Sequence, residues 1–360
     1  MSKKIKVLIV DDSKSVQNIF SSIIEKDPNM EVLDVADNPF EAVKIIKKQI
    51  PDVITLDINM PKMDGITFLK KIMSQHPIPV LIVSTLINDN DKLIVEALQI
   101  GAADVIKKPY DIGNKREEFE IFFRDKILAV SKIRLSKHKA IINKIPEKLS
   151  ADVIIPKSKR KKVDLSSQQV IAIGASTGGT TALMRLLSDI NTDMPAIIVA
   201  QHMPESFTLS FAQRLDQLCW LNVKEAEDGE ELKRNSVYIA PGNKHVYIRS
   251  FGEKIYIVAR KGPLVNRHRP AVDVLFRAVA FEIGKNAIGV LLTGMGDDGA
   301  KGLLEIKNAE GYTIAQDESS SVVFGMPKAA IELKAASIVL PLEQMAGYIV
   351  NRVKKMSYHG

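Results

Sequence analysis

Short apolar runs alternate with segments of helical periodicity along most of this chain, and this alternation limits its fold more than any other feature. The first series contains the runs "IKVLIV", "DVITLD", "PVLIVST" and "ADVIKK". After the possible cap Ser13, Val16, Phe20 and Ile24 lie at helical spacing on one stripe. Strands that alternate with helices form parallel α/β sheets. The first series therefore predicts about five β/α units.

A second series of the same kind begins at Gln168 with "QVIAIGA" and continues through "PAIIVAQ" and "AIGVLL". A hairpin-like strand cluster is expected between "SVYIA" and "KIYIVA". Between the two series, residues 137–167 lose periodicity and gather lysine, serine and proline, which is typical of a flexible tether. A chain of 360 residues suits two α/β domains joined by such a linker.

Composition excludes several classes of protein. No apolar run approaches the roughly 18 residues that a membrane-spanning helix needs, so membrane insertion is not expected. The single cysteine, Cys219, rules out an internal disulfide, and the cytoplasm is the natural compartment. Much of the excess of basic residues that gives the net charge of +7 lies in "KSKRKKVD". This stretch is interpreted as solvated linker rather than as a nucleic-acid arm.

Carboxylates follow two strands of the first series. Asp11 and Asp12 come after "KVLIV", and Asp57 comes after "VITL". The carboxyl ends of parallel strands meet at one edge of the sheet, which is where such sheets bind ligands. Clustered carboxylates repel one another, and a hard divalent cation such as Mg²⁺ relieves that repulsion. The alternative, aspartates that only cap helices, fits a single residue better than three.

Together with Ser84 and Lys108, these aspartates resemble the pattern of a two-component receiver domain, most specifically in "DINMPKMDG". The resemblance implies a flavodoxin-like fold with a five-stranded parallel sheet, over residues 1–125. It also implies site roles: phosphorylation at Asp57; Mg²⁺ binding by Asp12, Asp57 and the Asn59 carbonyl, assisted by Asp11; and a switch formed by Ser84 and Lys108. Many receivers carry an aromatic switch residue where this chain has Val105, which argues against a rotating-aromatic mechanism.

The segment "GASTGG" joins the strand "QVIAI" to the helical segment "TTALMRLL" and presents Ser176 in a G-x-S-x-G pattern. Such a turn exposes a serine hydroxyl beside backbone N–H groups. A nucleotide-phosphate loop at a helix N-terminus would look similar. A dinucleotide site, however, requires G-x-G-x-x-G, and Ser176 stands where its second glycine should be.

A histidine and two aspartates follow neighbouring strands. His202 ends "PAIIVAQ", and "AIGVLL" leads to Asp297 and Asp298 in "TGMGDDGAKG". One aspartate could orient the imidazole so that it accepts the proton of Ser176, while the glycine-rich turn offers amides to an oxyanion. The order Ser, His, Asp differs from that of α/β-hydrolases, in which the acid precedes the histidine.

Several stretches resemble the catalytic domain of the chemotaxis protein-glutamate methylesterases: "GASTGG", "QHMP", "YIAPGNKH", "RPAVDVLFRA", "LLTGMGDDGAKG" and "VVFGMPKAA". The resemblance implies a doubly wound α/β methylesterase domain at residues 168–355, with residues 126–167 as helical extension and basic linker. It places the triad on Ser176, His202 and Asp298. The Met295 amide is implied as an oxyanion donor, and Thr177 and His245 are weaker candidates for support.

The resemblance implies a phosphorylation-activated enzyme that releases methanol from glutamate methyl esters on methyl-accepting chemotaxis receptors. It also implies deamidation of receptor glutamines. A chemotaxis histidine kinase would supply the phosphate; Mg²⁺ is expected in the receiver, no cofactor for the esterase reaction, and no nucleic-acid partner. The basic segment "LVNRHRP" is either a receptor-docking surface or a solvated loop. The alternatives are a binding protein with an inert triad, a DNA-binding response regulator and a nucleotide-binding output domain.

Overall fold

The computed structural model describes residues 4–60, 65–75, 77–84, 91–108, 116–131, 149–156 and 168–357. The chain forms two compact units, Met1–Ala140 and Ile141–Gly360, and each is described by itself. Within the described residues, no helix is both long enough and apolar enough to cross a membrane.

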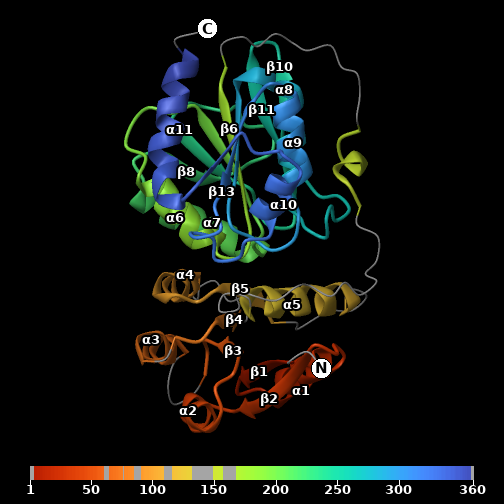
Figure 1. Ribbon diagram of the computed structural model, residues 1–360, viewed down its shortest axis with the longest axis vertical. Coiled ribbons are helices and arrows are strands. Elements are labelled where there is room, and N and C mark those ends of the chain that lie inside the picture. The colour runs from red at the N-terminus through yellow and green to blue at the C-terminus, as the bar shows by residue number, and fades with distance from the viewer. Residues whose placement is uncertain are drawn as a thin grey trace. The chain divides into compact units, whose positions relative to one another are not determined.

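The N-terminal unit is a five-stranded sheet with the order β2-β1-β3-β4-β5, and every strand pair is parallel (Figure 1). Its strands are β1 (Ile5–Val10), β2 (Met30–Ala36), β3 (Val53–Asp57), β4 (Val80–Ser84) and β5 (Asp104–Lys107). Its helices are α1 (Lys14–Glu25), α2 (Pro39–Lys48), α3 (Gly65–Gln75), α4 (Asp91–Ile100) and α5 (Arg116–Ser131). This is the flavodoxin-like strand order, so the predicted fold is confirmed.

Local sequence explains why the first helix begins where it does. Ser13 is the N-cap of α1, and its hydroxyl accepts a hydrogen bond from the Val16 amide. Val16, Phe20 and Ile24 are buried in the core of this unit, with Phe20 stacked on Phe123 of α5. The apolar stripe therefore fixes α1 on the sheet and leaves the loop after β1, with its two aspartates, at the sheet edge.

The C-terminal unit is a seven-stranded parallel sheet with the order β14-β13-β12-β6-β7-β9-β8. Its strands are β6 (Val170–Ala175), β7 (Ala196–Gln201), β8 (Asn222–Glu225), β9 (Ser236–Ile239), β12 (Ala287–Leu291), β13 (Tyr312–Gln316) and β14 (Ile338–Leu340). Its helices are α6 (Gly179–Ser188), α7 (Glu205–Leu218), α8 (Val272–Glu282), α9 (Ala300–Asn308), α10 (Met326–Glu332) and α11 (Leu342–Ser357), with 3₁₀ turns η2 (Ala151–Val153) and η3 (Gly284–Asn286).

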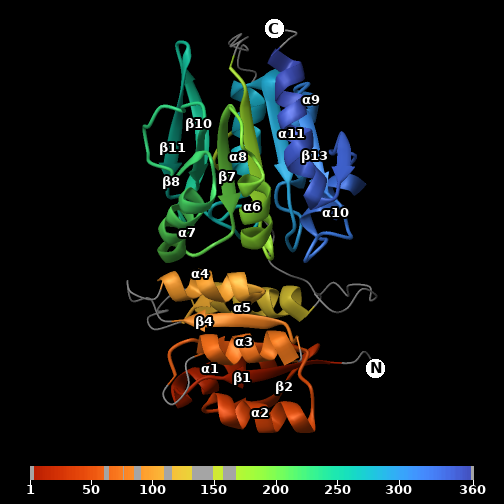
Figure 2. The ribbon, with the colours of Figure 1, turned by 90° about the vertical axis from the view of Figure 1, so that its left-hand side faces the viewer.

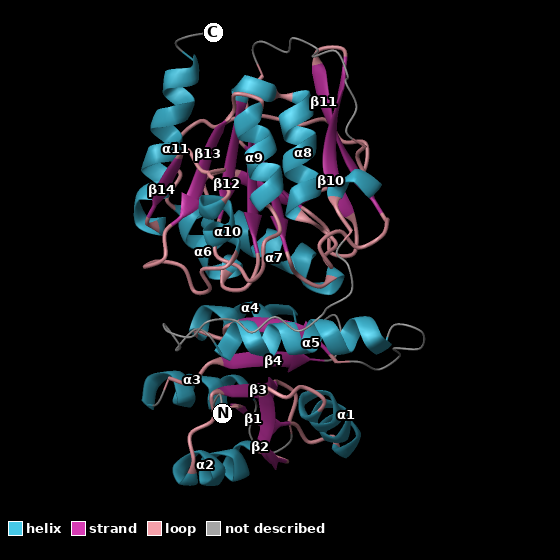
Figure 3. Ribbon diagram, turned by 45° about the vertical axis from the view of Figure 1, so that its right-hand side comes forward, coloured by secondary structure: helices cyan, strands magenta, loops and turns pink. Residues whose placement is uncertain are grey.

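Helices cover both faces of this sheet. Helix α6 contacts α7 and α11, whereas α9 contacts α8 and α10, and Figure 3 shows the strands between the two groups. The unit is thus the predicted doubly wound α/β domain. The chain builds outward from β6 in one direction and returns to build outward from β12 in the other. The carboxyl ends of β6 and β12 therefore flank the topological switch point, where such sheets bind ligands.

The strand cluster in the middle of the second series differs from expectation in one respect. β10 (His245–Phe251) and β11 (Lys254–Arg260) form an antiparallel hairpin, which lies at the margin of the unit in Figure 2 and packs on α8. The segment "SVYIA" instead provides β9, a parallel strand of the main sheet between β7 and β8. Val237, Tyr238 and Ile239 of β9 are buried because the sheet is covered on both faces, so alternation alone did not distinguish β9 from a hairpin strand.

Part of the predicted flexible tether is packed instead. Residues 149–156 include η2, and Ala151 and Ile155 are buried in the core of the C-terminal unit. The apolar residues in "ADVII" explain this packing, since their burial removes apolar surface from water. The rest of the predicted tether lies outside the described residues.

Candidate active site and receiver site

Ser176 occupies a tightly constrained turn at the end of β6. Its amide donates to the Thr293 carbonyl at 3.0 Å, and its carbonyl accepts from the Gly179 amide at 2.7 Å. Gly178, at the N-cap of α6, has φ of 78°, and a Cβ there would lie 2.5 Å from that of Val322. Glycine is therefore required at position 178 both by its conformation and by space. The turn places Ser176 at the switch point, before the positive end of α6.

His202 follows the neighbouring strand β7 and is tied to the serine turn. The two strands pair with Ala175 opposite Gln201, and the His202 amide donates to the Ala175 carbonyl at 3.1 Å. The Gln201 side chain donates to the carbonyls of Ser176 (3.0 Å) and His202 (3.2 Å). Gln201 is 1% exposed, so this bridge holds the two residues from within the core. Its role was not predicted, although its position directly before His202 was the available signal.

Asp298, the predicted acid of the triad, contacts His202. His202 Nε2 lies 2.8 Å from Asp298 Oδ2, and both side chains are buried. The carboxylate also accepts from the amides of Val272 (2.7 Å) and Asp273 (3.1 Å), which begin α8. A helix N-terminus stabilises an anion. Asp297, the other aspartate of "GMGDDG", is half-exposed and its carbonyl accepts from Ala300.

The charge state of this pair follows from its surroundings. Burial by itself would raise the pKa of Asp298, but the hydrogen bond and charge of His202, together with His268 and Asn266, hold that pKa below its ordinary value. An ionised Asp298 can only accept a hydrogen bond, which Nε2–H of His202 donates, so the neutral imidazole carries its lone pair on Nδ1. Within the described part of the chain, the buried Nδ1 of His202 has no hydrogen-bond partner. Nδ1 is therefore the atom that can accept a proton.

The basic segment "LVNRHRP" contributes to this arrangement. Asn266 Nδ2 donates to Asp298 Oδ1 at 2.8 Å, and the His268 ring stacks on His202 with centroids 3.7 Å apart. Arg269 donates to Asn243 Oδ1 and to the Gly262 carbonyl. Neither of the two roles expected for this segment includes contact with the triad. The basic reading of the segment rested on Arg267, His268 and Arg269, and the contact of His268 with His202 and that of Asn266 with Asp298 were not predicted.

The expected support residues lie in different surroundings. Gly294 packs directly against Ser176. The half-exposed Met295 is the next residue, so its backbone amide also lies close to the serine.

Thr177 is buried, and its carbonyl accepts from Thr293 Oγ1 at 3.0 Å. His245 Nε2 lies 2.8 Å from the Pro263 carbonyl, and burial lowers the pKa of this imidazole. His245 thus fixes the loop that leads to Asn266. The oxyanion role of Met295 and the support role of Thr177 stay predictions.

Gly294 offers a test of how closely the serine turn is packed. A Cβ at position 294 would lie 2.3 Å from Met326 Sδ and 2.7 Å from Ser176 Cβ. Gly294→Ala should therefore displace Ser176 and lower esterase activity by about 100-fold, because a displacement of about 1 Å in a reacting group can reduce the rate by that factor. Esterase assays of the purified variant would measure this.

Gly347→Ala is the matched control, since nothing lies within 4 Å of a Cβ there. Alanine in α11 should keep activity and add up to about 1 kcal/mol to the free energy of unfolding. A fully active Gly294→Ala variant would show that Gly294 does not limit the position of the serine.

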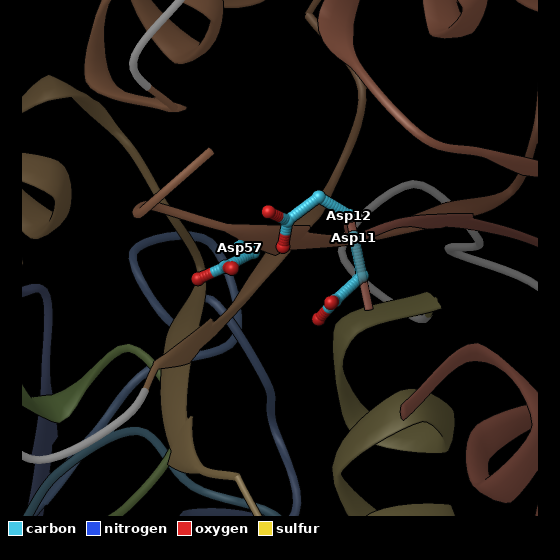
Figure 4. A group of neighbouring side chains, drawn as sticks. All are labelled: Asp11, Asp12 and Asp57. Atoms are coloured by element: carbon cyan, nitrogen blue, oxygen red, sulfur yellow. The ribbon is translucent and has the colours of Figure 1, made fainter. Parts of the chain in front are cut away.

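In the N-terminal unit, the predicted carboxylates do come together. Figure 4 shows Asp11 and Asp12 from the end of β1 beside Asp57 at the end of β3, and one ligand atom from each lies within 4.8 Å of the others. The Asn59 amide donates to Asp57 Oδ1 at 3.1 Å. Asp12 is exposed and the other two aspartates are buried. Oxygen donors so arranged fit Mg²⁺, which prefers carboxylates and keeps several waters.

The predicted lysine lies between two of these carboxylates. Lys108 Nζ is 2.7 Å from Asp11 Oδ2 and 2.6 Å from Asp57 Oδ2. Burial raises the pKa of Asp57, and the Lys108 ammonium opposes this rise. Ser84 is fully buried at the end of β4, and its carbonyl accepts from the Lys108 amide at 2.8 Å. Val105 is buried within β5, and residues 61–64 of "DINMPKMDG" lie outside the described residues.

Each of the two units resembles a known protein family. Residues 171–349 match the family model "CheB methylesterase", and residues 7–119 match "Response regulator receiver domain". A protein-glutamate methylesterase/protein-glutamine glutaminase of Geobacter metallireducens is 50% identical over 96% of this chain and 98% of that protein. One of Rhodospirillum rubrum is 48% identical over 96% of this chain and 98% of that protein.

A solved structure agrees with the fold of the C-terminal unit. The Thermotoga maritima CheB methylesterase catalytic domain is 42% identical, with a TM-score of 0.51, and the match covers 52% of this chain and all of that one. Relatives that match at this identity over nearly their full length share both units in the same order. The chain therefore belongs to the CheB methylesterase family, as an esterase whose catalytic domain follows a response regulator receiver domain.

Proposed function

We propose that this enzyme hydrolyses glutamate γ-methyl esters on methyl-accepting chemotaxis receptors, releases methanol, and also deamidates receptor glutamines. One observation carries the proposal: the buried pair of His202 and Asp298 leaves Nδ1 of the imidazole without a partner among the described residues. His202 directly follows β7, which pairs with β6, and Ser176 directly follows β6. The names of the relatives supply the substrate class. The proposal includes a cytoplasmic location, which the single cysteine of the chain supports.

The reaction follows from these atoms. Ser176 Oγ attacks the ester carbonyl while Nδ1 of His202 takes its proton, and Asp298 stabilises the resulting imidazolium. The C–O bond to the methoxy group then breaks, and the imidazolium returns the proton so that methanol leaves. Water attacks the acyl-enzyme by the same route and yields glutamate and free Ser176. A glutamine side chain would give the same acyl-enzyme with ammonia as the leaving group, and the Met295 amide would donate to the oxyanion.

The receiver supplies the control in this proposal. A histidine kinase of the chemotaxis pathway, or a small phosphodonor, would transfer a phosphoryl group to Asp57. Mg²⁺ held by Asp12, Asp57 and the Asn59 carbonyl, near Asp11, would offset the negative charge of the transferred group. Ser84 and Lys108 would contact the phosphoryl group after transfer. Phosphorylation shifts the enzyme toward its active state only by stabilising that state more than the inactive one.

Phosphodonor should raise methanol release from methylated receptor membranes several-fold in the presence of Mg²⁺, and Asp57→Asn should abolish the increase. The amide side chain cannot form the acyl phosphate, but it preserves the size of the buried group. Asp34→Asn is the matched control, since the side chain of this exposed aspartate of β2 accepts only from the neighbouring Val35 amide among the hydrogen bonds described. Stimulation that persists in Asp57→Asn would assign phosphorylation to another residue.

The same membranes separate the rival functions. A binding protein with an inert triad would associate with receptors and release no methanol with or without phosphodonor. A nucleotide-binding output would show saturable ATP or GTP binding that does not depend on Ser176. Either result, obtained with folded wild-type protein, would contradict the proposed hydrolysis.

A further inference from the structure

The turn that contacts the triad has a specific geometry. The amide and carbonyl of Val265 and His268 bond to each other at 3.2 and 2.8 Å, and the two residues between them have positive φ, 50° for Asn266 and 70° for Arg267. Two positive φ values identify a type I′ turn, for which asparagine is a favoured first residue. The turn directs the Asn266 side chain to Asp298, while His268 lies on His202.

Asn266 joins two carboxylates through one amide group. Its Nδ2 donates to Asp298 Oδ1 at 2.8 Å and to Asp273 Oδ2 at 2.7 Å, and the residue is 9% exposed. Burial and the charge of Asp298 raise the pKa of Asp273 to about 7, which reflects how poorly this site accommodates a second negative charge. Two N–H donors with no charge suit the position, and an aspartate at 266 would add a third carboxylate.

The backbone of Asn266 is held by the end of the connection between the two units. Its amide donates to the Leu149 carbonyl at 2.9 Å. Residues 149–156, here called the strap, are anchored further along by Arg277 of α8, which donates to Asp152 Oδ1 (2.7 Å) and to the Ile155 carbonyl (3.1 Å). Arg277 is buried and also bonds Glu305 of α9.

Apolar contacts complete the anchoring. Ala151 and Ile155 are 3% and 8% exposed, and a Cβ on Gly262 would lie 2.7 Å from Ile154 Cδ1. The strap therefore packs against the loop that leads from Gly262 to Asn266 as well as against the helices. It lies in the same compact unit as the triad, although in chain order it belongs to the interdomain connection.

We propose that Asn266 is a positioning residue for Asp298 and that the strap, through its Leu149 carbonyl, holds Asn266 in place, so that the interdomain connection itself sets the activity of the hydrolase. This inference rests on the proposed function. A strap that moved would shift the Asn266 amide, and Asp298 would lose a donor that keeps its carboxylate aligned with His202. The nucleophile would remain intact, but its base would be misoriented.

A double-variant cycle in the full-length protein tests this. Asn266→Ala should lower kcat for methanol release by about 30-fold with little change in KM, because receptor binding is unaffected while the base is misaligned. Asp152→Asn, which removes an ion pair from a half-exposed side chain, should lower kcat about 3-fold. If the strap acts through Asn266, the double variant should be no slower than Asn266→Ala alone.

Two further readouts separate this inference from the proposed function. The rate at which a fluorophosphonate probe labels Ser176 needs no receptor, and it should follow the same pattern across the variants. The downfield NMR signal of the His202 Nε2 proton should shift in Asn266→Ala. If wild-type protein labels rapidly but releases no methanol, the substrate proposal fails and the inference about the strap can still be judged.

Asp189→Asn is the matched control, because this exposed aspartate at the C-cap of α6 carries the same change away from the strap. Ile155→Ala loosens the apolar anchor of the strap and should reproduce the loss seen in Asp152→Asn, with thermal unfolding measured for every variant. Effects of Asp152→Asn and Asn266→Ala that multiply in the double variant would overturn the inference. So would strap variants that label Ser176 at the wild-type rate.

Discussion

Ser176→Ala is expected to lower methanol release from methylated receptors by at least about 10⁴-fold. Without Oγ no acyl-enzyme forms, and the remaining amides and His202 could at most assist direct attack by water. The fold should be retained, because the backbone of Ser176 ties it to its neighbours: its amide bonds Thr293, and its carbonyl accepts from Gly179 and Gln201. The change therefore removes one oxygen atom and leaves the turn in place.

The measurement is methanol release at saturating receptor, together with fluorophosphonate labelling and thermal unfolding. Ser188→Ala serves as control, since this exposed serine at the end of α6 donates to the Arg185 carbonyl, away from the triad. A Ser176→Ala protein that keeps a tenth of wild-type activity would exclude Ser176 as the nucleophile and would favour direct attack by water.

Asp298→Asn should lower kcat by about 10⁴-fold, through the tautomer of His202 rather than through loss of the fold. The native carboxylate accepts from His202, Asn266 and the two amides that begin α8. An amide group in its place must turn its NH₂ toward some of these donors. If it faces Nε2, it forces the proton onto Nδ1, and the imidazole can no longer accept the proton of Ser176.

The same substitution should also reduce the free energy of unfolding by about 1–3 kcal/mol, because buried donors lose their acceptor. Asp297→Asn is the matched control, since this half-exposed neighbour shares the "GMGDDG" segment. Its activity should stay within about 2-fold of wild type, as expected for a surface change away from the reacting atoms. If Asp297→Asn were the more damaging of the two, the acid of the triad would have to be reassigned.

The sequence predicted both sheets because each depends on local periodicity. Short buried strands and amphipathic helices alternate in chain order, and parallel topology then brings the residues that follow each strand to one edge. For this reason Asp57, Lys108, Ser176 and His202 could be placed before the structure was known. Choosing Asp298 over Asp297 needed the family resemblance, since two adjacent aspartates in a glycine-rich loop follow the same strand.

Other parts of the site could not be predicted because they depend on contacts between loops distant in the chain. Asn266 reaches Asp298 only because a type I′ turn directs it there, and Gln201 bridges two carbonyls across paired strands. Lysine and serine suggested a tether for residues 137–167. Within it, the apolar residues of the strap are too few to show periodicity, and their burial depends on Arg277 and on the loop from Gly262.

The strap also bears on how such proteins can be recombined. A hybrid that fuses a different input domain to this hydrolase would ordinarily be joined where the basic stretch ends, close to Gln168. That junction would discard the Leu149 carbonyl and the Asp152 carboxylate, and with them partners of Asn266 and Arg277. A transferable hydrolase segment therefore starts upstream of Leu149. The part of the linker in which a new input domain can be joined is thus shorter than the sequence suggests.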